Sequence, residues 1–86
     1  MKVRIPTPLR SYTGGAASVE ATGSTVAELL EDLDCRYPGI RFRMVDEAGR
    51  LRQHMNVFVR RERCRDLSTS VEPTDEVVIM QALSGG

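Results

Sequence analysis

The chain carries few side chains of the kinds that perform nucleophilic or metal chemistry. Its 86 residues include two cysteines, Cys35 and Cys64, and one histidine, His54. Zinc sites and cysteine-ligated iron–sulfur clusters need more soft ligands at closer spacing, so we expect no bound metal. A Cys–His nucleophile pair is the alternative, and nothing in the spacing favours it. We expect Cys35 to be a small buried residue on a helix and Cys64 to be an exposed thiol in a charged turn.

The C-terminal sequence Leu83-Ser84-Gly85-Gly86 carries the more informative chemistry. It follows an apolar segment directly, and four extended residues reach about 13 Å. Glycine lacks Cβ, so it can pass through a narrow channel and adopt dihedral angles closed to other residues. Such a tail suits delivery of the α-carboxylate of Gly86 into the active site of another enzyme. Frayed strand ends also tolerate glycine at little cost, so the pair alone is a weak signal.

The chemistry open to that carboxylate is activation. A free carboxylate is a poor electrophile because resonance stabilises it and its negative charge repels a nucleophile. Transfer of adenylate from ATP removes the charge and supplies a leaving group, after which sulfur can displace AMP and leave a thiocarboxylate. The tail contributes no general base, nucleophile or metal, so a partner would have to supply the dry pocket for this step. We therefore expect a protein that is not an enzyme and binds no cofactor, while its partner uses ATP.

Composition narrows the class of protein. A chain of 86 residues with 41% hydrophobic and 28% charged residues is typical of one small domain with a modest core. Twelve basic and twelve acidic side chains give zero net charge, which argues against a general nucleic-acid binder. No apolar run approaches the ~20 residues of a membrane span, and no apolar segment of signal-peptide length begins the chain. We expect a cytoplasmic domain that binds neither nucleic acid nor membrane.

Four strands would position the tail. Residues 2–5 and 18–21 alternate between polar and apolar side chains, which predicts a hairpin. Residues 55–59 are rich in β-branched and aromatic side chains, and residues 76–80 consist of Glu76 followed by four apolar residues, so each predicts a further strand. Residues 9–17 and 40–54 show weaker patterns, and we expect turns in both.

One helix is predicted between the second and third strands. Thr25 and Glu28 have the spacing of a capping box, and Pro38-Gly39 ends the helix. Its apolar stripe follows helical spacing and consists of Val26, Leu29, Leu30, Leu33 and Tyr37. The acidic residues on its other side, Glu28, Glu31, Asp32 and Asp34, favour a solvated face over an interaction surface.

This order of elements predicts an α+β fold of the β-grasp, or ubiquitin-like, type. One helix covers only one face of a sheet, and the first and last strands can pair side by side in its centre. We expect a mixed sheet of about four to five strands with one main helix on one face. The domain would span residues 1–82, and residues 83–86 would form a free, flexible tail that ends in Gly-Gly.

Alternation along the strands also predicts a surface. If Val77 and Ile79 face the helix, then Phe58, Val78 and Met80 face outward from the uncovered side of the sheet. Three large apolar side chains there would form a partner-docking patch. The alternative is that a long loop of the chain covers them.

Residues 60–65 predict a basic turn, with arginine at four of six positions. No aromatic residue is interleaved with these arginines, which favours a solvated rim. A surface for nucleic acid or for an anionic partner is the alternative.

The chain resembles the ubiquitin-like β-grasp sulfur carriers of the ThiS/MoaD family. These include the small subunit of molybdopterin synthase, the thiamine-pathway carrier and the cysteine-biosynthesis carrier of actinobacteria. The segments that resemble the family's helix start, third strand, final strand and tail are residues 25–30, 56–59, 75–80 and 83–86. Those that resemble the entry of the cysteine-biosynthesis type are residues 5–7, 9–10 and 13–15.

The resemblance implies the partners and the residues involved. The Gly86 carboxylate would be adenylated by a ubiquitin-activating-like enzyme and thiocarboxylated by a sulfur donor, with Leu83, Ser84 and Gly85 as the threaded tail. A downstream synthase would accept the sulfur, and in the cysteine branch this is a pyridoxal-phosphate cysteine synthase. A zinc metalloprotease would then release the carrier–cysteine amide. Because the chain already stops at Gly86, we expect no trimming.

Alternatives remain open at two levels. Cysteine is the favoured destination of the sulfur, ahead of other sulfur-containing metabolites, thiamine and molybdopterin. The same activated carboxylate would also suit a protein modifier joined to lysines. A small structural subunit of a synthase is the third function that fits the sequence.

Overall fold

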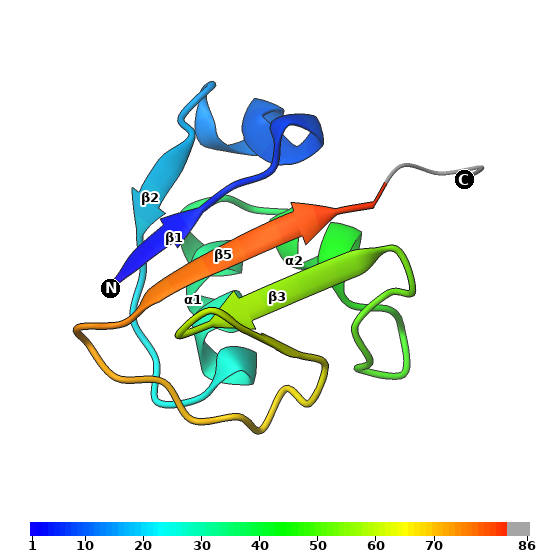
Figure 1. Ribbon diagram of the computed structural model, residues 1–86. Helices are drawn as coiled ribbons and strands as arrows, with labels where there is room; N and C mark the ends of the chain where they lie inside the picture. Colours follow the sequence, from blue (N-terminus) through cyan, green and yellow to red (C-terminus); the bar gives the residue numbers. More distant parts are fainter. Residues whose placement is uncertain (83–86) are drawn as a thin grey trace.

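The computed structural model describes residues 1–82, and the predicted tail of residues 83–86 lies outside this range. The chain forms a five-stranded mixed sheet with its helices on one face (Figure 1). The strands are β1 (Lys2–Arg4), β2 (Ser18–Glu20), β3 (Met55–Val59), β4 (Glu62–Cys64) and β5 (Glu76–Gln81). The helices are the 3-10 helix η1 (Thr7–Thr13), α1 (Val26–Arg36) and α2 (Ile40–Met44).

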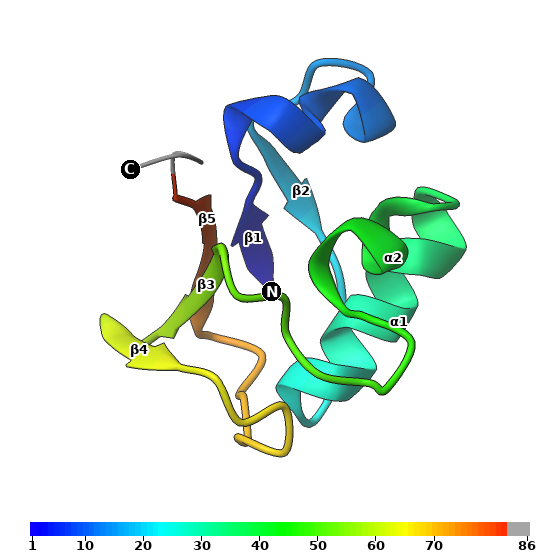
Figure 2. The same cartoon turned by 90° about the vertical axis from the view of Figure 1, so that its right-hand side faces the viewer.

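The strand order β2-β1-β5-β3-β4 confirms the predicted β-grasp. The first and last strands, β1 and β5, pair in parallel at the centre, and every other pair is antiparallel. Helices α1 and α2 both lie on the same side of the sheet, while the other face carries no described helix (Figure 2). Among residues 1–82, no helix has the length and apolar character needed to cross a membrane.

Helix α1 begins where the sequence predicts because Thr25 caps it. The Thr25 hydroxyl accepts a hydrogen bond from the Glu28 amide at 3.2 Å. The Glu28 carboxylate accepts a hydrogen bond from the Ser24 amide at 2.9 Å. In a standard capping box the donor would be the amide of the cap residue itself, Thr25. The first bond satisfies an amide that the first helical turn leaves without a partner, and the second ties the segment before the cap to that turn.

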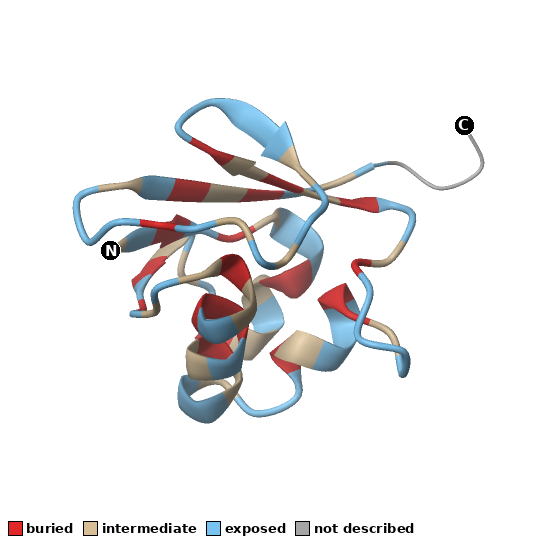
Figure 3. Cartoon of the chain, turned by 90° about the horizontal axis from the view of Figure 1, so that it is seen from below, coloured by how far each residue is buried: buried red, intermediate tan, exposed pale blue. Residues whose placement is uncertain are grey.

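The core lies between the sheet and the helices, and Figure 3 shows buried residues on the strands and on the helices beneath them. Strands β3 and β5 alternate strictly, so one side chain in two enters this layer. Tyr37, predicted to complete the stripe of α1, follows the helix and is only partly buried. The buried residues from α1, β3 and β5 are Val26, Leu29, Leu30, Leu33, Met55, Val57, Val59, Val77 and Ile79.

Three elements were not predicted, and each depends on contacts that are not visible in a sequence pattern. Helix η1 occupies the segment expected to be a turn, and it ends at Gly14, whose φ of 65° is left-handed. Helix α2 begins after Gly39, where the Asp34 carboxylate accepts hydrogen bonds from the Gly39 and Arg41 amides, both at 3.1 Å. Strand β4 exists because it pairs with β3, so the predicted basic turn is wrong over residues 62–64.

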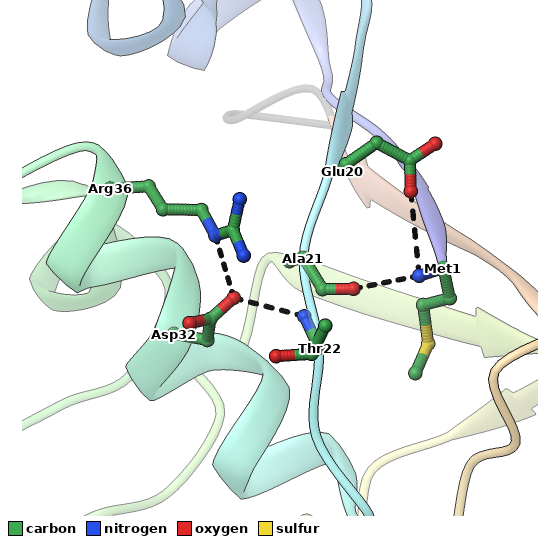
Figure 4. A network of polar contacts seen from close by, with 6 residues as sticks. All are labelled: Met1, Glu20, Ala21, Thr22, Asp32 and Arg36. Atoms are coloured by element: carbon green, nitrogen blue, oxygen red, sulfur yellow. Dashed lines mark hydrogen bonds and ion pairs between the residues drawn. The ribbon is translucent and has the colours of Figure 1, made fainter.

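A polar network ties the N-terminal strands to α1 (Figure 4). The Met1 amino group donates to the Ala21 carbonyl at 2.8 Å. One carboxylate oxygen of Asp32 accepts hydrogen bonds from the Thr22 amide at 2.9 Å and from Arg36 Nε at 2.8 Å. The Thr22 amide and the Arg36 guanidinium together lower the pKa of Asp32. The network joins the end of β2 to the middle of α1.

Candidate functional site

The three residues of the predicted docking patch lie together on the sheet. Phe58 on β3 is directly opposite Val78 on β5, and Met80 on β5 is opposite Asn56. Phe58 and Val78 are half-buried, and Met80 is 52% exposed. The residues that alternate with them, Val57, Val59, Val77 and Ile79, are buried toward the helices, so Phe58, Val78 and Met80 project from the other face. We call these three residues the sheet patch.

Two arginines flank the sheet patch. Arg63 on β4 is opposite Phe58, and Arg4 on β1 is opposite Val78. Both arginines are exposed, and neither forms an ion pair with another residue in the range 1–82. An apolar centre with a charged rim is the composition of a protein–protein interface.

The patch continues toward the end of β5. A groove between this strand and the segment that follows β1 is lined by Pro6, Pro8, Arg10, Met80 and Gln81, among others. The Ala82 amide donates to the His54 carbonyl at 2.8 Å, which ties the chain beyond β5 to the segment before β3. The predicted activation residue Gly86, with Leu83, Ser84 and Gly85, lies outside the described residues.

The cysteines differ from both expectations. Cys35 is exposed, because it lies two residues after the buried Leu33 and therefore on the opposite side of α1. Cys64 lies on β4 opposite Val57 and is partly buried, and this burial raises the pKa of its thiol. A raised pKa disfavours the thiolate that a nucleophile needs. The described part of the chain brings no three His, Cys, Asp or Glu side chains together as a metal site.

Two arginines of the predicted basic turn have structural roles. Arg60 forms an ion pair with Asp75, the residue before β5. The Arg65 guanidinium donates to the main-chain carbonyls of Met55, Leu51 and Arg52 at 2.7 to 3.0 Å. Only Arg61 and Arg63 of the four remain without such partners in residues 1–82.

Sequence reasoning missed an exposed aromatic residue near the same end of β5. Phe42 on α2 is 58% exposed, and with Met80 it is one of the two exposed large hydrophobic residues among those described. The signal was the pattern of Ile40 and Met44, which are four residues apart and buried, so that Phe42 between them faces outward.

The fold and the sheet patch define a ubiquitin-like β-grasp protein with an apolar surface that extends along β5 to Met80. The chain belongs to the ThiS family, whose model matches residues 3–86. The resemblance predicted from the sequence is therefore confirmed.

Individual relatives agree with this assignment. The chain is 39% identical to the sulfur carrier protein CysO of Mycobacterium tuberculosis, over 98% of this chain and 96% of that protein. Among solved structures, it is similar to a chain of the Amycolatopsis orientalis BexX/CysO complex, with a TM-score of 0.92, 42% identity and coverage of 99% and 98%. It is also similar to small archaeal modifier protein 1 of Methanosarcina acetivorans, with a TM-score of 0.81, 26% identity and coverage of 99% and 94%.

Proposed function

We propose that this protein is a sulfur carrier whose Gly86 carboxylate is adenylated and then converted to a thiocarboxylate. The observation that carries the proposal is the sheet patch, which runs along β5 to the point where the Leu83–Gly86 segment follows in sequence. Membership of the ThiS family and the likeness to CysO support it.

Two steps make up the proposed chemistry. The carboxylate oxygen of Gly86 attacks the α-phosphorus of ATP, pyrophosphate leaves, and an acyl adenylate forms. Hydrosulfide, or an equivalent sulfur donor, then attacks the acyl carbon, and AMP leaves with the C–O bond electrons. The ATP and the pocket that excludes water belong to a ubiquitin-activating-like enzyme, so the carrier acts as a substrate in the cytoplasm and binds no cofactor.

The sheet patch is proposed as the surface that the adenylating enzyme grips. Phe58 and Val78 supply an apolar centre, and Met80 extends it toward the end of β5. Arg4 and Arg63 supply a rim that sets the orientation of the complex.

The downstream partner is proposed to be a cysteine synthase that uses pyridoxal phosphate, followed by a zinc metalloprotease that releases the carrier–cysteine amide. The support is the likeness to CysO proteins. A synthase for another sulfur metabolite, thiamine or molybdopterin would use the same thiocarboxylate.

Intact mass spectrometry tests the proposal. The full chain is incubated with its cognate adenylating enzyme, ATP and sulfide, and a chain that lacks Gly85 and Gly86 is treated in parallel. We expect the mass of the full chain alone to rise by the difference between one sulfur and one oxygen atom. No rise with an enzyme that exchanges pyrophosphate would refute the carrier function.

A protein modifier is the second candidate, and the likeness to small archaeal modifier protein 1 favours it. In this function a target lysine, rather than sulfur, displaces AMP. Immunoblotting of a cell lysate would show a ladder of heavier adducts that disappears when Gly85 and Gly86 are removed.

A further inference from the structure

A second groove lies at the end of β5, on the side toward α2. It is lined by Leu9, Phe42, Arg43, Arg52, His54 and Gln81, and we call it the tail-base groove. Gln81 lines both this groove and the groove beside Met80. The two exposed large hydrophobic residues, Phe42 and Met80, therefore flank the last residue of β5.

Phe42 is held in its exposed position. The Arg52 guanidinium lies over the Phe42 ring, 4.8 Å from its centroid, and Arg52 Nε donates to the Phe42 carbonyl at 2.9 Å. These contacts restrict both the ring and the backbone of Phe42 before any partner binds. A pre-ordered aromatic side chain loses little conformational entropy on association, which is the property of an interface anchor.

The groove is cationic. Arg43 and Arg52 line it, and none of the described residues that line it carries a carboxylate. The ion pairs within residues 1–82 are Met1–Glu20, Arg36–Asp32 and Arg60–Asp75, so Arg43 and Arg52 have no acidic partner there. A chain of zero net charge thus presents unneutralised positive charge next to the strand that precedes the tail.

We propose that the tail-base groove docks an acidic surface of the adenylating enzyme, with Phe42 in an apolar pocket and Arg43 and Arg52 against carboxylates at the rim of the channel that admits the tail. This inference rests on the proposed function and adds a second contact, on the helix side of β5, to the sheet patch. Opposite charges at this rim accelerate association and orient the tail. Single-stranded nucleic acid is a poorer fit, because the groove offers two arginines and one aromatic ring and the chain is neutral.

Two variants and one matched control test the inference. Arg43→Glu reverses a charge in the groove, and no hydrogen bond of the Arg43 side chain lies within residues 1–82. Arg61→Glu makes the same charge change in the turn after β3, at the opposite end of that strand from His54. Phe42→Ala removes the anchor, and thermal unfolding checks that each variant is folded.

Affinity for the cognate adenylating enzyme is measured by titration calorimetry without ATP, and pyrophosphate exchange is assayed on the same samples. We expect the dissociation constant to rise about tenfold or more for Arg43→Glu and for Phe42→Ala, and less than about threefold for Arg61→Glu. We also expect added salt to weaken binding of the wild-type chain more than that of Arg43→Glu.

Equal affinities for Arg43→Glu and Arg61→Glu, with pyrophosphate exchange intact, would overturn this inference and leave the carrier function standing. Binding to a poly-dT oligonucleotide that is tighter than binding to the enzyme, and that Arg43→Glu abolishes, would overturn it in favour of nucleic acid. No pyrophosphate exchange with the wild-type chain would remove the proposed function and this inference with it.

Discussion

Phe58 and Val78 lie directly opposite each other on the antiparallel strands β3 and β5, on the face of the sheet that no described helix covers. Arg63 and Arg4 continue the same row on the outer neighbours of these strands. The row combines side chains from four strands, so it exists only when the sheet is assembled. Its apolar centre next to the end of β5 is the basis of the first prediction.

Phe58→Asp is expected to leave the domain folded and to weaken adenylation. Phe58 is half-buried on the outer face, so its replacement leaves the packing between sheet and helix intact. Loss of an apolar residue from an interface centre raises the KM for the carrier about tenfold. The measurements are thermal unfolding by circular dichroism and pyrophosphate exchange.

The matched control is Val57→Asp, one residue away on the inner face. Val57 is fully buried, so a charge there has no water and no partner, and this variant should not fold. Unfolding of Phe58→Asp as well would place Phe58 in the core and remove the sheet patch.

Arg61→Gly is expected to stabilise the fold. Arg60 and Arg61 form the two-residue turn between β3 and β4 with φ values of 51° and 69°, which is the left-handed region. A Cβ raises the energy of that conformation, and glycine has none, so the substitution removes this cost from the folded state. Glycine also gives the unfolded chain more conformational freedom, which offsets part of the gain. The net free energy of unfolding should rise by about 0.5–1 kcal/mol. Urea denaturation measures the change.

Arg61→Ala is the control that separates the release of left-handed backbone strain from the loss of the arginine charge. It removes the same guanidinium and keeps Cβ, so its stability should remain close to that of the wild type. A gain in Arg61→Ala equal to that in Arg61→Gly would assign the effect to charge.

Gly23→Ala is expected to destabilise the protein. A Cβ at Gly23 would lie 2.6 Å from the Leu29 nitrogen and 3.0 Å from the Glu28 carbonyl carbon, both backbone atoms of α1. The helix or the preceding segment must then move, at a cost of about 1–3 kcal/mol. Denaturant midpoints should show this loss, whereas the neighbouring exposed Ser24→Ala should change stability by less than about 0.5 kcal/mol.

Asp32→Asn is expected to destabilise the fold at neutral pH and to matter less in acid. The Thr22 amide and Arg36 hold the pKa of Asp32 below its ordinary value of 3.8 in the folded chain. Because this pKa is lower in the folded than in the unfolded chain, the ionised carboxylate stabilises the fold. Its contribution to the free energy of unfolding is complete above the unfolded-state pKa, and it is lost as the pH falls through the folded-state pKa. The gap in unfolding free energy between Asp32→Asn and the wild type should therefore close below pH 3.8.

Glu31→Gln is the control for that experiment. It makes the same charge change at the adjacent, exposed position, where no hydrogen bond to the carboxylate lies within residues 1–82. Urea denaturation of all three proteins at about pH 7 and about pH 2 compares them. A gap that stays constant with pH would show that ionisation of Asp32 does not stabilise the fold.

The main strands and the long helix were predictable because their signals are local. The β-branched and apolar residues within 55–59 and 76–80 and the Thr25 cap are each signals carried by a few neighbouring residues. The central pairing of β1 with β5 also followed, because few topologies place one helix over such a set of strands.

Acidic residues on α1 were harder to interpret. The sequence favoured a solvated face for Asp32 and Asp34. In the structure, however, Asp32 accepts a hydrogen bond from the Thr22 amide, and Asp34 accepts hydrogen bonds from the amides at the start of α2. Their partners lie five to ten residues away in the sequence. A helical pattern of charges does not indicate which loop amides will lie close to these carboxylates.

Local sequence was enough to locate the main strands, the start of α1 and the Gly-Gly tail after an apolar strand, because each of these depends on neighbours along the chain. The folded chain was needed to show that β4 forms, that Arg65 binds three backbone carbonyls, and that Arg52 holds Phe42 beside Gln81. These contacts join residues from separate segments, and their geometry exists only after the sheet brings those segments together.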